Sequence, residues 1–215
     1  GRSFAALCVL LIAAPVTAHE SWIEPLVFRA ATAERIVAQL KNGQHFKGNP
    51  FPYLPSETVT AGIWDAKGKR PLTGAEGDEP AIDEKVRAPG LQVLFYESVA
   101  DRVNFAEAGE FQHYLSEKGL DGIWQAHKDR GLRETGITEA YSRCAKALVW
   151  RESGNKPDRQ DTPVGMPLEW VAKANPFALS SGKNAVFPVQ LLWQGKPLAG
   201  ALATVFRRDG TGAVQ

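Results

Sequence analysis

The chain has 215 residues, of which 44% are hydrophobic and 23% are charged, a composition typical of a globular protein that buries a core. Its 25 Lys and Arg residues nearly balance its 24 Asp and Glu residues. This balance argues against nucleic-acid binding, which usually needs a strongly basic surface.

Residues 1–18 have the order of a secretory signal peptide. A single basic residue precedes an apolar stretch (4–14), and "PVTA" then places the small residues Val16 and Ala18 where a signal peptidase reads. The stretch is shorter than the about 20 apolar residues of a spanning helix. We expect export to the periplasm, cleavage after Ala18, and a mature chain without a membrane span that begins at His19. The alternative is a buried apolar N-terminal helix.

Cleavage would also decide the state of the two cysteines. It removes Cys8 and leaves Cys144, and a single cysteine forms no internal disulfide. We expect Cys144 to be a small buried residue on a strand. A metal-binding or catalytic thiol is the alternative.

Short strand-like runs follow from residue 19 to about residue 99. They are β-branched or aromatic, and they lie at 22–30, 35–43, 58–69 and 90–99. The connections "GNPFPYLPSE" and "TGAEGDEPAIDE" are rich in proline, glycine and acidic residues. This spacing predicts an antiparallel, immunoglobulin-like β-sandwich over 19–152.

The middle of the sandwich sequence changes period. Two sets of apolar residues follow the i, i+3, i+4 spacing of an amphipathic helix, and they are Phe111, Tyr114 and Leu115, then Leu120, Ile123 and Trp124. Gly119 and Gly131 stand where helices end. We therefore expect an insertion of two short helices over about 107–131. The stretch "ITEAYSRCAKALVWRE" after it predicts one long strand that returns to the sandwich.

The segment 153–167, "SGNKPDRQDTPVGMP", is polar and proline-bearing, and it predicts a linker. Residues 168–215 then predict two strands around a glycine-centred turn. We expect them to begin a second, truncated β-sandwich unit of immunoglobulin or prealbumin type, with its remaining strands beyond Gln215.

No familiar enzyme signature occurs in the chain. It has no glycine-rich phosphate loop, G-x-S-x-G, H-E-x-x-H or paired-cysteine zinc motif, and we expect a protein without catalytic turnover. Histidine is the remaining candidate chemistry. After cleavage His19 would offer its α-amine, whose pKa lies near about 7.7, and its ring to one ion. A nitrogen site of this kind suits nickel or copper, and the alternative is a frayed, solvated terminus.

Three other histidines are candidate partners for His19. His45 lies in the turn-rich "KNGQHFKGN", where a histidine between lysines is otherwise just solvated. His127 lies four residues after Ile123 on the predicted buried stripe, where it is either a ligand or a hydrogen-bonded core residue. His113 is the weaker helical candidate. We name His19, His45 and His127 as the candidate metal ligands.

Other side chains near the new terminus have simpler interpretations. Alternation places Glu20 and Glu24 on the strand face opposite His19, where they support a metal ligand or face solvent. The aromatic residues expected in the core are Trp22, Phe51, Tyr53, Trp64 and Trp124.

Several quoted stretches together resemble a known family. They are "AHESWIEP", "NGQHFKGNPFPYLPSE", "AHKDRGLRETGITEAYSRCAKALV", "NPFAL" and "GKPLAGA". Their order is similar to that of the exported bacterial family catalogued as domain of unknown function 4198, whose members are often labelled as periplasmic components of nickel or cobalt uptake systems. The resemblance implies an export signal, a β-rich fold and nickel or cobalt handling, with His19, His45 and His127 as the residues able to ligate metal. The family pattern has "NGQNFKG" where this chain has "NGQHFKG", which weakens His45 as a family-wide ligand.

Three hypotheses follow from the sequence. The first is a periplasmic metal-binding accessory that passes nickel, cobalt or copper to an uptake transporter in the inner membrane. The second is an immunoglobulin-like adhesion or ligand-binding module with incidental histidines. The third is a histidine-brace copper redox enzyme, which needs His19 and a second histidine around an open copper position.

Overall fold

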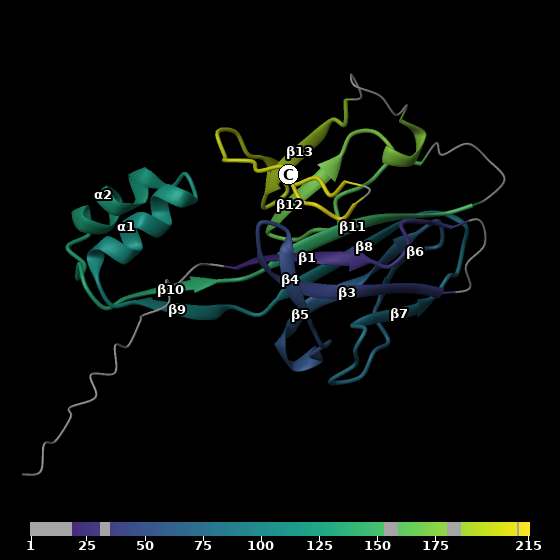
Figure 1. The fold of residues 1–215 in the computed structure, drawn as a ribbon, viewed down its shortest axis with the longest axis horizontal. Helices are drawn as coiled ribbons and strands as arrows, with labels where there is room; N and C mark the ends of the chain where they lie inside the picture. The colour runs from purple at the N-terminus through teal and green to yellow at the C-terminus, as the bar shows by residue number, and fades with distance from the viewer. Residues whose placement is uncertain (1–18, 31–34, 153–158, 180–185, 210) are drawn as a thin grey trace, which may run out of the picture. The chain divides into compact units, whose positions relative to one another are not determined.

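The computed structural model describes residues 19–30, 35–152, 159–179, 186–209 and 211–215. The predicted signal peptide and the first part of the predicted linker therefore lie outside the described residues. The described chain forms two compact units, a helical unit of Asn104–Thr138 and a β unit of His19–Val103 with Glu139–Gln215 (Figure 1).

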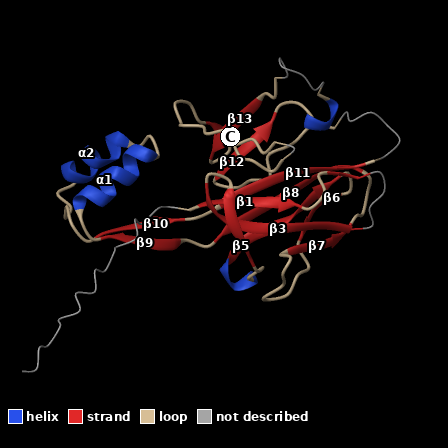
Figure 2. Ribbon diagram, in the orientation of Figure 1, coloured by secondary structure: helices blue, strands red, loops and turns tan. Residues whose placement is uncertain are grey.

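The fold is mainly β, as predicted (Figure 2). The strands are β1 (Glu20–Pro25), β2 (Arg29–Ala30), β3 (Arg35–Gln44), β4 (Lys47–Phe51), β5 (Thr58–Asp65), β6 (Gly68–Pro71), β7 (Ile82–Lys85), β8 (Gly90–Ser98), β9 (Asp101–Phe105), β10 (Ile137–Tyr141), β11 (Cys144–Arg151), β12 (Leu168–Ala172), β13 (Val189–Trp193) and β14 (Lys196–Pro197). The α-helices are α1 (Ala108–Glu117) and α2 (Asp121–Asp129), and two short 3-10 turns cover Pro55–Glu57 and Pro176–Ala178. No helix in the described part of the chain is long and apolar enough to cross a membrane.

Two sheets share one core in a sandwich-like arrangement. The first sheet has the order β1-β3-β4, with β7 also paired to β3, and the second has the order β2-β11-β8-β5-β6. All these pairs are antiparallel except β2 with β11. Alternate residues of β3 (Ile36, Ala38 and Leu40) are buried, because successive side chains of a strand point to opposite faces. They meet Leu94 and Val149 of the second sheet in one apolar cluster.

The central strand β8 is buried on both faces. Leu94 and Tyr96 face the core between the sheets, whereas Leu91 and Phe95 belong to a second cluster on the outer face. Such a strand is a nearly continuous apolar run rather than an alternating one, which explains the stretch "GLQVLFYESV".

Residues 159–167, in the second half of the predicted linker, contribute to that outer cluster. They contain no helix or strand, yet Val164 and Met166 are buried against Leu91 and Trp150. The strands that follow form a separate three-stranded sheet, β12-β13-β14, within the same compact unit. The immunoglobulin-like or prealbumin-like character of either part stays a prediction.

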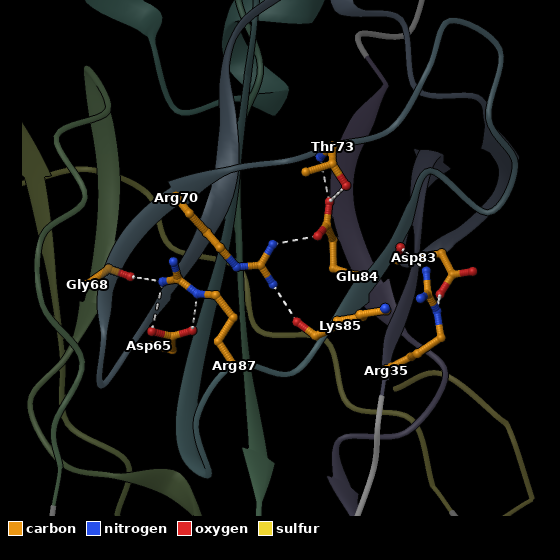
Figure 3. Close-up of polar contacts among 9 residues, drawn as sticks. All are labelled: Arg35, Asp65, Gly68, Arg70, Thr73, Asp83, Glu84, Lys85 and Arg87. Carbon is orange, nitrogen blue, oxygen red and sulfur yellow. Dashed lines mark hydrogen bonds and ion pairs between the residues drawn. The ribbon is translucent and has the colours of Figure 1, made fainter.

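Salt bridges join the two sheets along one edge (Figure 3). Arg70 of β6 contacts Glu84 of β7 at 2.5 Å, and Arg87 donates two hydrogen bonds to the fully buried Asp65 carboxylate. Burial alone would raise the pKa of Glu84, but hydrogen bonds from Thr73 and Arg70 lower it. Since each carboxylate here already has a cationic partner, we interpret this cluster as one that stabilises the contact between the two sheets.

The structure corrects several details of the sequence prediction. The stretch 137–152 is two strands, β10 and β11, that separate at Ser142 and Arg143. Phe111 is buried as predicted, but Leu120 and Ile123 are 42% and 45% exposed. In helix α2 the buried residue is His127 instead.

The remaining core predictions are partly right. Tyr53 is buried, whereas the other four aromatic residues expected there (Trp22, Phe51, Trp64 and Trp124) are half-buried. Cys144 lies on β11 as predicted and is half-buried rather than fully buried. Burial raises the pKa of its thiol.

Candidate functional site

A cleft of about 710 Å³ opens where β3 and β8 end and where β1, β4 and β11 begin. It lies wholly within the β unit. Side chains in its wall include His19, Asn42, Lys47, Glu57, Asp101 and Arg143. Cations, anions and amides therefore converge on a single concave surface, and polar groups in a concave site fix the orientation of a bound ligand.

The hairpin of β3 and β4 forms one wall of the cleft. Its two turn residues, His45 and Phe46, have φ angles of 52° and 58°, as a tight two-residue hairpin turn requires. Gly43 pairs with Gly48 beside the turn. A Cβ atom on Gly48 would lie 2.3 Å from the Asn42 carbonyl oxygen, so these two strands approach too closely here for a side chain.

A hydrogen-bonded chain positions Asp101 and Arg143, two further residues of the cleft wall. The Arg143 Nη2 donates to the Tyr141 hydroxyl at 3.0 Å, and that hydroxyl donates to Asp101 Oδ2 at 2.9 Å. The guanidinium carbon of Arg143 also lies 4.7 Å from the centre of the Tyr141 ring, a favourable cation–π contact. Ser98 anchors the Arg143 backbone by accepting from its N–H and donating to its carbonyl, both at 2.9 Å.

This chain also sets the charges in the cleft. The Arg102 backbone N–H and the Tyr141 hydroxyl lower the pKa of Asp101, so the carboxylate stays ionised. Burial and the hydrogen bond to Asp101 raise the pKa of Tyr141, and burial raises the pKa of Tyr96. Both phenols therefore remain neutral donors at neutral pH.

His19, the first predicted ligand, lies in the cleft wall and is exposed. Its strand neighbours do not simply face solvent. Glu20 accepts a hydrogen bond from the Phe46 backbone N–H at 3.3 Å, and Glu24 contacts Trp22, Lys41 and Arg208. The first strand is therefore held beside the hairpin.

His45, the second predicted ligand, lies at the hairpin tip outside the cleft lining. Its ring packs edge-on against Phe206, with the ring centres 6.2 Å apart. Its neighbours Gln44 and Lys47 do line the cleft. The structure therefore places His45 near this wall without turning it into the cleft.

His127 and His113 belong to the helical unit. His127 is 7% exposed, and its ring stacks on Trp124 with the ring centres 5.7 Å apart. Its Nε2 lies 2.6 Å from the Arg133 carbonyl oxygen, and this nitrogen must carry the hydrogen because a carbonyl only accepts. His113 is exposed and contacts Glu117 at 3.3 Å.

The three candidate ligands are thus divided between two units. Among the residues that the structure describes, no group of three or more His, Cys, Asp or Glu side chains is arranged to hold a metal ion. Imidazole is a ligand that suits nickel, cobalt and copper. His19 is the one histidine in the described lining of the cleft.

Sequence reasoning missed the charged residues of the cleft. Asp101 and Arg143 come from strand ends far apart in the chain, so no local spacing links them. The one available signal is the polar "YSR" at 141–143, which interrupts the apolar alternation of the predicted long strand.

The fold and the site define a mainly β protein with a polar cleft at one end of its sandwich-like unit. The family model described as domain of unknown function (DUF4198) matches residues 16–214, and the chain belongs to this family. No curated protein and no solved structure matches the chain.

Proposed function

We propose that the protein is an exported periplasmic binding protein that holds nickel, cobalt or copper at His19 and passes it to an uptake transporter in the inner membrane. It acts without catalytic turnover. The observation that carries the proposal is the position of His19 in the wall of a polar cleft.

The chemistry of the cleft wall supports this proposal. After cleavage at Ala18, His19 would supply an amine and an imidazole, and a chelate of two nitrogens favours ions late in the divalent affinity order. Glu57, Asp101 and Asn42 lie in the same lining and keep the surroundings of this chelate polar.

Calorimetry on two chains tests the proposal. One chain begins at His19 and the other carries one glycine before it, which converts the amine into an amide but keeps the ring. We expect nickel to bind the first chain at least about tenfold more tightly than the second, and His19→Ala to abolish binding. His113→Ala, which removes an exposed histidine of the helical unit, is the matched control and should leave the affinity unchanged.

The results have distinct meanings. Equal affinity for the two chains would eliminate the terminal amine as a ligand, and unchanged binding by His19→Ala would eliminate the site. Failure of nickel, cobalt and copper to bind either chain would favour a second candidate function, a ligand-binding module without metal. The cleft volume of about 710 Å³ supports that candidate, because small-molecule sites measure about 300–1,000 Å³.

A further inference from the structure

The cleft is much larger than a metal ion requires. Its volume is about 710 Å³, whereas one water molecule occupies only about 30 Å³ in the liquid. A cleft of this size fits an organic molecule of several non-hydrogen atoms. The other side chains of the lining must therefore be considered as ligand-binding groups in addition to His19.

Among the side chains of the lining, Arg143 selects the chemistry of a ligand most specifically. The guanidinium has five N–H donors in a rigid fork, and the tyrosine hydroxyl uses one of its nitrogens. The ion pairs found among the described residues do not include Arg143. Its Nε is buried, so a ligand in the cleft would meet the terminal nitrogens of the guanidinium. A planar carboxylate is the group that this fork binds best, because two parallel N–H···O bonds form at once.

The arginine is also held in place before a ligand arrives. The contact with the Tyr141 ring and the two hydrogen bonds to Ser98 restrict both its side chain and its backbone. Binding then loses little side-chain entropy, which raises affinity for a matching anion. Lys47 in the same lining adds a second positive charge.

Nearby groups limit the charge of the ligand. Asp101 and Glu57 are both carboxylates in the lining. A ligand that carried only negative charge would meet both of them. A complex in which a cation and carboxylates are combined matches a cleft that presents both signs.

We infer that the cleft takes its metal as the complex of a small organic acid, with His19 on the ion and Arg143 on a carboxylate of the acid. The inference rests on the proposed function and adds the class of ligand to it. Arg143 acts here as a binding residue for the acid and has no contact with the ion.

Calorimetry with the chain that begins at His19 tests this inference. The probes are nickel ion alone, citrate alone, the one-to-one nickel–citrate complex, and nickel with ethylenediamine, which is a chelate of similar kind without a carboxylate. We expect nickel–citrate to bind at least about tenfold more tightly than nickel or nickel–ethylenediamine, as a charged bidentate contact allows.

Substitutions of Arg143 then test whether this residue causes the tighter binding of nickel–citrate. Arg143→Gln should remove the preference for nickel–citrate over nickel alone, and Arg143→Lys should restore only part of it because lysine lacks the fork. Arg102→Gln, an exposed arginine outside the cleft lining, is the matched control. A thermal melt of each variant verifies its fold.

Every outcome bears on the inference. Equal binding of nickel and nickel–citrate, or a preference that survives in a folded Arg143→Gln variant, overturns it and leaves the metal site intact. Citrate that binds as tightly without nickel overturns the assignment of a metal complex. If neither nickel nor any complex binds, the proposed function itself fails, and the inference falls with it.

Discussion

Glu24 is the residue whose ionisation is tied most clearly to the folded state. Burial alone would raise its pKa, but hydrogen bonds from Trp22, Arg208 and Lys41 outweigh burial and lower the pKa from 4.5 to about 2. A depressed pKa stabilises the fold above the pKa of the unfolded chain, and this stabilisation is lost as the pH falls from about 4.5 towards 2.

We therefore predict that Glu24→Gln lowers the free energy of unfolding by about 1–2 kcal/mol at neutral pH, after solvent screening is allowed for. The difference from the parent chain should shrink as the pH falls through the same window. Urea unfolding at a series of pH values measures it, with the exposed Glu134→Gln as control. A difference that is independent of pH would show that packing, rather than charge, connects Glu24 to stability.

Among the individual residues of the site, the sequence predicted some and could not predict others. His19 was identified because a cleavage signal and a histidine are adjacent in the chain. Arg143 and Asp101 were not, because they meet only when β8 pairs with β11 and so brings the beginnings of β9 and β11 together. Residues that owe their position to long-range pairing leave no periodic trace in the sequence.

Among the elements, β11 and β12 are joined by a buried ion cluster. Lys146 Nζ of β11 lies 2.8 Å from Asp161 Oδ1 and 2.8 Å from Glu169 Oε1. The side chains of these three residues are 7%, 2% and 1% exposed, respectively. Backbone N–H groups of Val164 and Ala172 donate to the same carboxylates, so the cluster fastens the segment after residue 159 to the second sheet.

We predict that Lys146→Met lowers the free energy of unfolding by about 3–5 kcal/mol, because it leaves two buried carboxylates without their cation. Chemical denaturation measures this, and Lys173→Met on the exposed surface serves as control. Adding Asp161→Asn and Glu169→Gln should recover part of the loss, since these changes remove the unpaired charges. A loss no larger than that of the control would mean that the cluster contributes nothing.

The elements also show where sequence patterns were informative. The strands that border the core were predicted because they alternate or run continuously apolar, and both patterns report burial directly. The second helix was predicted with the wrong buried face, because Leu120 and Ile123 follow helical spacing but remain exposed. Periodicity identifies an amphipathic face, and only tertiary packing decides whether that face is covered.

For the whole molecule, the two units have separate cores. Neither of the apolar clusters of the β unit includes a residue from 104–138, and neither does the described lining of the cleft. Within the helical unit, the rings of Phe105, Phe111 and Tyr114 pack together, with the Phe105 and Phe111 centres 5.1 Å apart. Each unit therefore has apolar contacts of its own.

We predict that replacing Asn104–Thr138 by the dipeptide Asn-Gly, a preferred two-residue hairpin turn, leaves a β unit that folds and binds. Circular dichroism should show retained strand signal, denaturation should remain cooperative, and nickel affinity should stay within about threefold of the parent chain, because no group in the cleft wall is removed. The control carries the same dipeptide in place of Lys173, where the sheet between β12 and β13 would be disturbed. If the shortened chain folds but no longer binds nickel, the helical unit supplies a ligand, and His127 becomes the residue to test next.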